Sequence, residues 1–407
     1  YFLKPKSRDD LERRYETHRR IASWTHGFMG RSPDNFPSYL TGLATQPELF
    51  NEILDGAGDR LEAYYRKARR EDLFMSHAVT NPQGSRRAGV EIDAADVISP
   101  TLRVVSEDEE GVTINGLKMI GTGAIYCHET WVGNLQPVPP GNVPLNSDGV
   151  SIWSRKSYEA MAGSEFDMPL SARYDETDAA ILFENVKVPW DRVFLHNNVA
   201  MTREIYFRTP GHALANHQAN VRFVEKLRLI VAIAHKLTES NKAGAIPAVR
   251  GTLGNLAAQL ATLESMVRGQ IYDCEDMPNG YVTINRRFMY AALHWCTNNH
   301  SKICDVVREL MGGGPIQMPA DSSVMEDPEL NKKFETYWSL PDQSAKDRMK
   351  LFRLAWDILG TEFAGRHMLY EKFYAGPSFI MDLYSYQVAG WDKLDGVVDD
   401  LMAGYDL

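Results

Sequence analysis

The period of the hydrophobic residues changes twice along this 407-residue chain, and that change constrains the fold more than any single motif. Apolar residues recur at helical spacing within Asp9–Arg20 and Gln46–Arg70. From residue 73 to about 205, short β-rich runs alternate with Gly, Pro, Asn and Asp turns. From about residue 212, apolar faces at helical spacing return. The sequence therefore predicts an α+β fold: a helical unit, a β unit and a helical bundle in that order.

We expect these units to span residues 1–72, 73–205 and 206–407. The clearest expected strands are Val112–Ile120, Val150–Trp153 and Ala179–Phe183. The expected helices of the last unit contain Val221–Val231, Leu253–Val267, Arg286–Met311 and Gln343–Tyr374. The Gly- and Pro-containing stretch 27–37 is expected to be a turn or loop. Helices with such broad apolar faces suit a bundle.

Charge and cysteine content limit the class of protein. The formal net charge is -10, which argues against nucleic acid or an anionic membrane as a partner. No unbroken apolar run is long enough to span a bilayer. The four cysteines form no CxxC pair, as expected for reduced thiols in the cytoplasm. Because Tyr1 is not an initiator Met, we expect an N-terminal segment to precede it.

Several common catalytic signatures are missing from the sequence. There is no GxGxxG after a strand, no P-loop, no HExxH and no GxSxG. A Rossmann dehydrogenase, a P-loop NTPase, a zincin and an α/β-hydrolase are therefore disfavoured.

Two side chains near turns are candidates for binding or proton transfer. Arg31 lies in Gly30-Arg31-Ser32-Pro33-Asp34, and a guanidinium can donate two hydrogen bonds to an oxyanion. The alternative is a surface ion pair with Asp34. His77 follows Ser76, where an imidazole can act as a base or donor near neutral pH. The alternative there is a hydrogen-bonded structural histidine, and the residues alone leave both questions open.

Three glycine-containing segments allow a ligand to approach the backbone. Thr122 lies between Gly121 and Gly123 at the end of a strand-like run, where a simple turn is the default interpretation. The Gly312-Gly313-Gly314 run follows a helix, either as a C-cap or as a phosphate contact. Gly365 interrupts a helical pattern at a cost of roughly 1 kcal/mol relative to Ala, which suggests close packing or a ligand.

Segments along nearly the whole chain resemble the large component of 4-hydroxyphenylacetate 3-monooxygenase and the related phenol and halophenol hydroxylases. They are Phe28-Met29-Gly30-Arg31-Ser32-Pro33-Asp34, His77-Ala78 with Asn81-Pro82, Gly116-Leu117-Lys118 with Thr122, Ser157-Tyr158-Glu159, Pro169–Asp178, Asn185-Val186 with Val188-Pro189-Trp190, and Gly365-Arg366-His367 with Tyr370-Glu371. Their joint order and spacing make a chance match improbable.

The resemblance implies an acyl-CoA-dehydrogenase-like fold with an N-terminal helical domain, a middle β-barrel and a C-terminal four-helix bundle, assembled as a homotetramer or homodimer. It also implies an FADH2-dependent aromatic monooxygenase that receives reduced FAD from a separate NAD(P)H:flavin reductase. O2 would add to the flavin as a C4a-hydroperoxide, and one oxygen would pass to a ring carbon ortho to the hydroxyl of a small phenolic substrate. No metal is expected.

Roles for single residues follow from the same resemblance. Arg31 would stabilise phenolate character in the substrate, His77 would bind its hydroxyl, and Thr122 would lie beside the reactive edge of the flavin. Asn35 stands where 4-hydroxyphenylacetate hydroxylases have a Tyr that helps to hold the substrate, so we expect a different substrate. The flavin-binding residues implied are His77, Ala78, Asn81, Pro82, Gln83, Arg86, Thr122, Gly313, Gly365 and Arg366. Structural ion pairs are the alternative for Arg86 and Arg366.

Three other functions stay open. A lyase like 4-hydroxybutyryl-CoA dehydratase needs an iron–sulfur cluster held by three cysteines and one histidine, and no cysteine pair lies near the Ser76–Gln83 turn. His300 and Cys304 are one helical turn apart, but buried structural residues explain them better. An acyl-CoA-dehydrogenase-like flavoenzyme needs a carboxylate base in the last helices, such as Glu362 or Glu371. The third alternative is a scaffold protein that binds no flavin.

Overall fold

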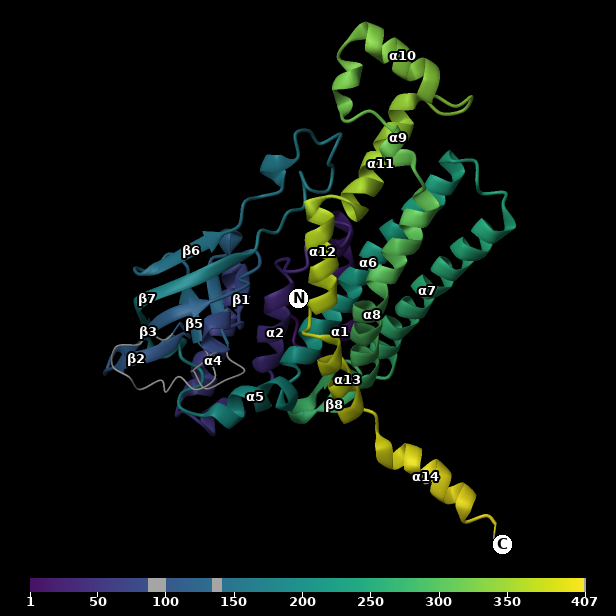
Figure 1. The fold of residues 1–407 in the computed structure, drawn as a ribbon. Helices are drawn as coiled ribbons and strands as arrows, with labels where there is room; N and C mark the ends of the chain where they lie inside the picture. Colours follow the sequence, from purple (N-terminus) through teal and green to yellow (C-terminus); the bar gives the residue numbers. More distant parts are fainter. Residues whose placement is uncertain (87–99, 134–140, 406–407) are drawn as a thin grey trace.

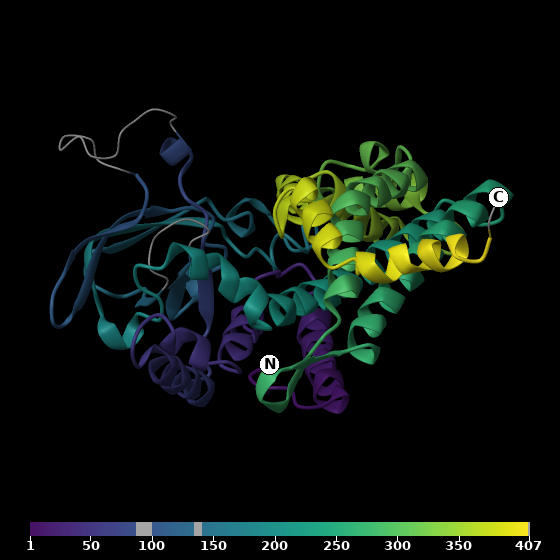
Figure 2. The same ribbon diagram turned by 90° about the horizontal axis from the view of Figure 1, so that it is seen from below.

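The computed structural model describes residues 1–86, 100–133 and 141–405. Its elements follow the expected order, with helices first, then strands, then helices again (Figure 1). The predicted α+β class is therefore confirmed. The strands of residues 75–189 gather on one side of the molecule and the long C-terminal helices on the other, as both views show (Figure 2).

The N-terminal helices are α1 (Arg8–Trp24), α2 (Asn35–Leu43), α3 (Glu48–Asn51) and α4 (Ala57–Glu71). The side chain of Ser7 caps α1 by accepting a hydrogen bond from the backbone N–H of Asp10. The stretch predicted as a loop ends early, because α2 begins inside it at Asn35. All nine residues of α2 are buried, so no amphipathic period marked this helix in the sequence. It packs against α6 and β1.

The β unit contains β1 (Met75–Ala78), β2 (Arg103–Glu107), β3 (Gly111–Lys118), β4 (Glu129–Val132), β5 (Gly141–Pro144), β6 (Val150–Ser154) and β7 (Ala179–Pro189). These strands form a three-stranded sheet in the order β1-β4-β5 and a four-stranded sheet in the order β2-β3-β7-β6. No strand of the first sheet pairs with a strand of the second in the described ranges. The expected middle β-barrel is therefore a pair of open sheets here, not a closed cylinder.

The C-terminal unit contains α5 (Val199–Arg208), α6 (Gly211–Ser240), α7 (Pro247–Tyr272), β8 (Glu275–Met277), β9 (Tyr281–Thr283), α8 (Arg286–Met311), α9 (Gly314–Gln317), α10 (Pro328–Trp338), α11 (Ala345–Leu359), α12 (Glu362–Phe373), α13 (Ser378–Gln387) and α14 (Trp391–Met402). The central helix α6 packs against α1 and α2 as well as α7, α8 and α11. Residues of α1 and α6 share one core with the bundle, whereas α2, α3 and α4 form a second core with β1, β4 and α5.

The helical pattern predicted over Gln343–Tyr374 is divided into α11 and α12. Gly360 ends α11, and a Cβ at this position would lie 2.5 Å from the Trp356 ring. Thr361 then caps α12 by accepting a hydrogen bond from the backbone N–H of Ala364. At the end of the chain, α14 projects away from the bundle with no buried residue (Figure 1). None of the described helices has the length and apolar composition needed to cross a bilayer.

Candidate active site

The turn before α2 holds Arg31 by its backbone. The N–H of Arg31 donates to Glu176 Oε2 at 2.8 Å. The preceding Gly30 packs directly on Tyr370, whose hydroxyl oxygen would lie 2.1 Å from any Cβ at position 30. The predicted alternative, an ion pair between Arg31 and Asp34, is wrong, because Asp34 is buried and binds His18 Nδ1 at 2.7 Å.

The guanidinium of Arg31 contacts neutral groups. Its Nη1 donates to Asn35 Oδ1 and to the Tyr374 hydroxyl, each at 3.1 Å. Its Cζ lies 4.3 Å from the centre of the Tyr374 ring. No carboxylate forms an ion pair with this guanidinium in the described ranges. Burial opposes the charged form of Arg31, but Tyr374, Tyr370 and Glu176 outweigh it and hold its pKa above the usual value. Among the described residues, this half-buried cation thus has no direct counter-ion.

His77 lies on β1 in an aromatic environment. The centre of its ring is 5.4 Å from the Phe36 ring and 5.6 Å from the Tyr39 ring. Its Nε2 atom is buried and has no hydrogen-bond partner in the described part of the chain. Burial, followed by the positive charges of Arg31 and Lys118, lowers the pKa of His77 to about 3. The imidazole is therefore neutral at physiological pH and has one ring nitrogen available to a ligand.

Arg31, Asn35 and His77 thus lie on adjoining segments. Asn35 begins α2, and the next residue, Phe36, packs on the His77 ring. Asn35 also donates through Nδ2 to Gln218 Oε1 at 2.9 Å, which fixes its amide from the side of α6. The charge of Arg31 lowers the pKa of His77, so the two groups interact electrostatically. The sequence-predicted substrate residues are therefore brought together.

Thr122 and Arg366 meet at a second cluster. The Thr122 hydroxyl donates to Asp178 Oδ1 at 2.8 Å. Arg366 donates to the same carboxylate at 2.7 Å and 2.9 Å, and to Glu176 Oε1 at 3.0 Å. Burial opposes the charged form of Arg366. The negative charge of Glu176 and the hydrogen bond to Asp178 outweigh this effect and hold the pKa of Arg366 above its usual value. Arg366 therefore forms the structural ion pairs that were its alternative interpretation.

The turn after β1 carries several of the predicted flavin residues. Ala78 and Pro82 are buried, whereas Gln83 is exposed. The Asn81 side chain accepts a hydrogen bond from Lys118 Nζ at 2.7 Å. The side chain of Arg86 lies outside the described part of the structure, so its role stays a prediction.

Lys118 is a buried residue near this turn that belongs to a segment of the family resemblance but was given no role from the sequence. Besides Asn81, its Nζ donates to the carbonyl oxygens of Val79 at 3.3 Å and Gly133 at 3.2 Å. Burial lowers the pKa of Lys118 to about 7. A signal was present in the sequence, because Lys118 continues the inward-facing positions of Val112 and Ile114 on β3. A lysine in that register indicates a special environment.

The two predicted glycines lie elsewhere. Gly365 is exposed, and a Cβ there would meet no atom within 4 Å. Close packing, one of the two explanations predicted for Gly365, is therefore not seen among the described residues, and space remains beside α12. Gly313 is also exposed, next to α9, which lies beyond α11 and away from α2 and β1 (Figure 1). The single chain thus does not bring Gly313 to Arg31 or His77.

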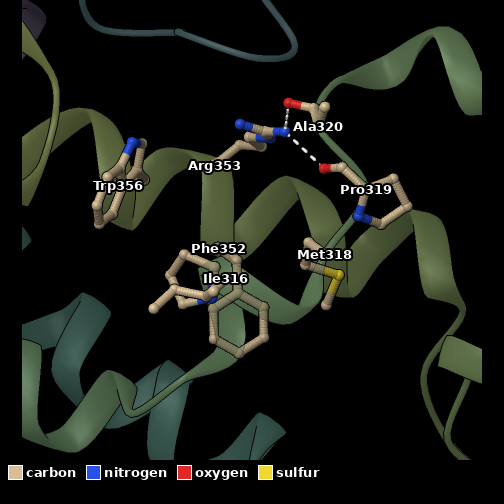
Figure 3. A pocket seen from close by; sticks show the side chains of 8 residues that line it. Ile316, Met318, Pro319, Ala320, Phe352, Arg353 and Trp356 are labelled. Atoms are coloured by element: carbon tan, nitrogen blue, oxygen red, sulfur yellow. Dashed lines mark hydrogen bonds between the residues drawn. The ribbon is translucent and has the colours of Figure 1, made fainter.

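A cavity of about 300 Å³ opens beside that glycine run (Figure 3). Its wall combines Ile316, Met318, Phe352 and Trp356 with the guanidinium of Arg353, which donates to the carbonyl oxygens of Pro319 and Ala320. Another cavity, of about 390 Å³, lies between residues 165–174 and α11. Neither cavity is lined by a predicted site residue.

The base required by the dehydrogenase alternative is not available. Glu371 accepts two hydrogen bonds from Arg222, at 2.6 Å and 2.8 Å, and one from Lys226 at 2.7 Å. Burial alone would raise the pKa of Glu371, but these two cations hold it far below the usual range. Such a carboxylate is a poor base. The other candidate, Glu362, is exposed to solvent at the start of α12.

The donor set required by the lyase alternative is not assembled either. Cys304 Sγ lies 3.6 Å from His300 Nε2, but burial raises the pKa of Cys304 to about 11. Across the described ranges, no group of three or more His, Cys, Asp or Glu side chains is arranged to hold a metal ion.

Comparison with known proteins shows the family. Residues 1–195 match the family "4-hydroxyphenylacetate 3-hydroxylase N terminal", and residues 202–403 match "4-hydroxyphenylacetate 3-hydroxylase C terminal". A curated relative is the oxygenase component of 4-nitrophenol 2-monooxygenase from Rhodococcus sp. It is 28% identical to this chain, over 100% of this chain and 79% of that protein.

Solved structures agree. The oxygenase component of 4-hydroxyphenylacetate 3-monooxygenase in complex with FAD and 4-hydroxyphenylacetate superposes with a TM-score of 0.90, at 25% identity, over 99% of this chain and 84% of that chain. An archaeal 4-hydroxybutyryl-CoA dehydratase from N. maritimus has a TM-score of 0.87 at 17% identity, over 100% of this chain and 82% of that chain. Butyryl-CoA dehydrogenase from Megasphaera elsdenii has a TM-score of 0.55 at 10% identity, over 91% and 80%.

At those low identities, the last two matches show the fold alone, and they confirm the predicted acyl-CoA-dehydrogenase-like architecture. The two family matches together cover almost the whole chain, including the Arg31 turn, His77 and the α12 segment. This chain belongs to the 4-hydroxyphenylacetate 3-hydroxylase family.

Proposed function

We propose that this chain is the oxygenase component of a two-component, reduced-FAD-dependent monooxygenase, and that Arg31 and His77 bind the hydroxyl of its phenolic substrate. One observation carries the assignment of these residues. The half-buried Arg31 guanidinium has no carboxylate partner within the described ranges, and the neighbouring His77 Nε2 is buried without a hydrogen-bond partner. Leaving such groups unpaired costs free energy, which an anionic oxygen offsets by accepting from both.

The chemistry of these side chains suits hydroxylation of a phenol. Arg31 lowers the pKa of a phenol bound beside it and so favours the phenolate. The neutral His77 ring donates to the same oxygen without adding a second positive charge. A phenolate pushes electron density to its ortho carbons, which activates them toward an electrophilic oxygen. The Phe36 and Tyr39 rings around His77 exclude water from this position.

The residues around the site fit a flavin. Reduced FAD, when bound, would supply the two electrons that activate O2; one oxygen atom of O2 would pass to the ring and the other would leave as water. The unpaired, buried Nε2 atom of His77 and the free space beside the exposed Gly365 support this proposal. Residues proposed to hold it are His77, Ala78, Asn81, Pro82, Gln83, Thr122 and Gly365. Arg366 acts on this site through Asp178, which accepts the Thr122 hydroxyl.

Partners follow from the same proposal. A separate NAD(P)H:flavin reductase supplies reduced FAD in the cytoplasm. Gly313 contacts flavin held by a neighbouring copy in a homotetramer or homodimer, which is compatible with its exposure far from Arg31 in the single chain.

The substrate is proposed to be a phenol other than 4-hydroxyphenylacetate. Relatives in the family are named for different phenols, including 4-nitrophenol and 4-hydroxyphenylacetate. The side chain at position 35 is an Asn whose amide already binds Arg31, Gln218 and Tyr374. It therefore contributes no aromatic wall to the substrate.

A stopped-flow experiment tests the proposal. The complex of the chain with reduced FAD is mixed with O2, and a panel of phenols is screened for hydroxylated product and for peroxide release. We expect a phenol that is hydroxylated with little peroxide in the wild type. Arg31→Ala and His77→Ala should each release peroxide instead, because flavin oxidation continues while the substrate is lost from position. Wild-type coupling in both variants would remove these residues from the site.

A further inference from the structure

Tyr374, the residue that follows α12, contacts Arg31 from the opposite end of the sequence. The Tyr374 ring lies 4.3 Å from the Cζ of Arg31 and 5.1 Å from the Cζ of Arg222. Arg222 is neutralised by the two-point ion pair with Glu371, whereas Arg31 has no such partner in the described ranges. Of these two cations, Arg31 is therefore the one left for a ligand, and the aromatic face of Tyr374 stabilises its positive charge.

The hydroxyl of Tyr374 completes a small network. It accepts from Arg31 Nη1 and from Asn35 Nδ2, each at 3.1 Å, and it donates to the carbonyl oxygen of Gly30 at 3.3 Å. Asn35 Oδ1 also accepts from Arg31 Nη1. Two neutral residues thus use both hydrogens of one guanidinium nitrogen, and this contact fixes the rotation of the Arg31 side chain.

The network leaves one edge of the guanidinium for a ligand. Arg31 Nη2 makes only a long contact, 3.5 Å, with the carbonyl oxygen of Tyr374. The Nε atom has no hydrogen-bond partner among the described residues. An edge formed by Nε and Nη2 is the edge through which arginine donates two parallel hydrogen bonds to an oxyanion.

We propose that Tyr374 is a positioning residue that, together with Asn35, turns the Nε–Nη2 edge of Arg31 toward the oxygen of a phenol that binds as its phenolate. This inference rests on the proposed function. It adds Tyr374 as a residue that positions Arg31, and it specifies the phenolate as the bound form of the substrate. It also assigns a role to the pair Asn35 and Tyr374. Asn35 stands where 4-hydroxyphenylacetate hydroxylases have a Tyr, and here a hydroxyl reaches the same arginine from α12.

Binding of 4-nitrophenol to the full chain tests this idea without turnover. Ionisation of this probe changes its visible absorbance, so a titration against pH, with and without oxidised FAD, reports both affinity and the pKa of the bound probe. We expect the wild type to bind the phenolate and to lower the pKa of the probe. Tyr374→Phe should bind roughly 3- to 10-fold more weakly and lower that pKa less, the size that the loss of one hydrogen bond of ordinary strength predicts.

Tyr370→Phe is the matched control. Tyr370 lies one helical turn before Tyr374, and its buried hydroxyl has no hydrogen-bond partner within the described ranges. Removing that hydroxyl should leave affinity and probe pKa unchanged. If Tyr374→Phe does not fold, Asn35→Ala removes the other anchor and carries the same expectation.

The outcomes separate the two proposals. If Arg31→Ala weakens probe binding but Tyr374→Phe and Asn35→Ala bind like the wild type, the role of Tyr374 is overturned and the proposed function stands. If Arg31→Ala binds the probe as well as the wild type does, the substrate role of Arg31 and the positioning role of Tyr374 both fail, whereas the oxygenase activity itself is decided by product formation in the stopped-flow screen. An equal loss in Tyr370→Phe and Tyr374→Phe would show a general packing effect and would also overturn the positioning role.

Discussion

The guanidinium of Arg366 binds both carboxylate oxygens of Asp178, at 2.7 Å from Oδ1 and 2.9 Å from Oδ2. The same Oδ1 atom accepts the hydroxyl of Thr122. Arg366 also donates to Glu176, whose other oxygen accepts the backbone N–H of Arg31. One arginine on α12 thereby connects the residue proposed to lie beside the flavin with the turn proposed to bind the substrate.

Arg366→Met should destabilise the fold, because it leaves the buried Glu176 carboxylate without its cation. The expected loss is about 3 kcal/mol in the free energy of unfolding, measured by urea denaturation. Arg268→Met is the control, since Arg268 is half exposed and its ion pair with Glu12 is worth at most about 1 kcal/mol. Wild-type stability combined with lost FAD affinity would instead make Arg366 a direct cofactor ligand.

The free energy of unfolding should fall as the pH is lowered from about 6.5, because four histidines resist protonation in the folded chain. Burial lowers the pKa of His77, His217 and His300 to about 3 and that of His212 to about 4. The unfolded chain takes up these protons near pH 6.5, so unfolding is favoured as pH falls from about 6.5 toward about 3. Each histidine contributes up to about 1.4 kcal/mol per pH unit in that window. Above pH 6.5 the effect is absent.

Urea denaturation at pH 7.5, 6.5 and 5.5, values chosen to span roughly the titration of free histidine, measures this dependence. His300→Gln should show a smaller pH slope, because one buried imidazole is gone. A midpoint that does not change between these pH values would contradict neutral burial of the histidines.

Glu371→Gln tests the ion cluster at the centre of the bundle. The substitution leaves Arg222 and Lys226 buried without an anion, so the free energy of unfolding should fall by about 3–5 kcal/mol. Glu362→Gln, at an exposed position, should have stability close to that of the wild type. A stable Glu371→Gln protein whose flavin is no longer bleached by an acyl-CoA, while the wild-type flavin is, would revive the dehydrogenase alternative.

Lys118→Met tests whether the buried ammonium supports the turn after β1. The change keeps the aliphatic length but removes a donor from Val79 O, Asn81 Oδ1 and Gly133 O. We expect a loss of about 1–3 kcal/mol, seen as a lower melting temperature, and weaker binding of FAD. Lys187→Met is the control, because Lys187 lies on β7 with a partly exposed side chain. A Lys118→Met protein with unchanged melting and FAD affinity would contradict this role.

Local sequence was sufficient for the order of the units. Helical spacing of apolar residues predicted α8 at its observed bounds, Arg286–Met311, because a helix that buries one face carries its own period. The same criterion could not find α2, which is buried on every side, and it joined α11 to α12 across Gly360. Closure of the β unit was also beyond local sequence, because strand pairing depends on partners distant in the chain.

The candidate site shows the same division. Residue type made Arg31 and His77 candidates for binding a ligand, but their proposed roles toward a phenol came only from the resemblance to the family. Only the tertiary structure decided that Asp34 binds His18 instead of Arg31. It also decided that Arg31 donates a hydrogen bond to Tyr374, 343 positions later in the chain. Such a contact has no local signature, since it exists only when α12 packs over the turn before α2. The packing of distant elements, not residue type, decides which charges in this chain are neutralised and which remain for a ligand.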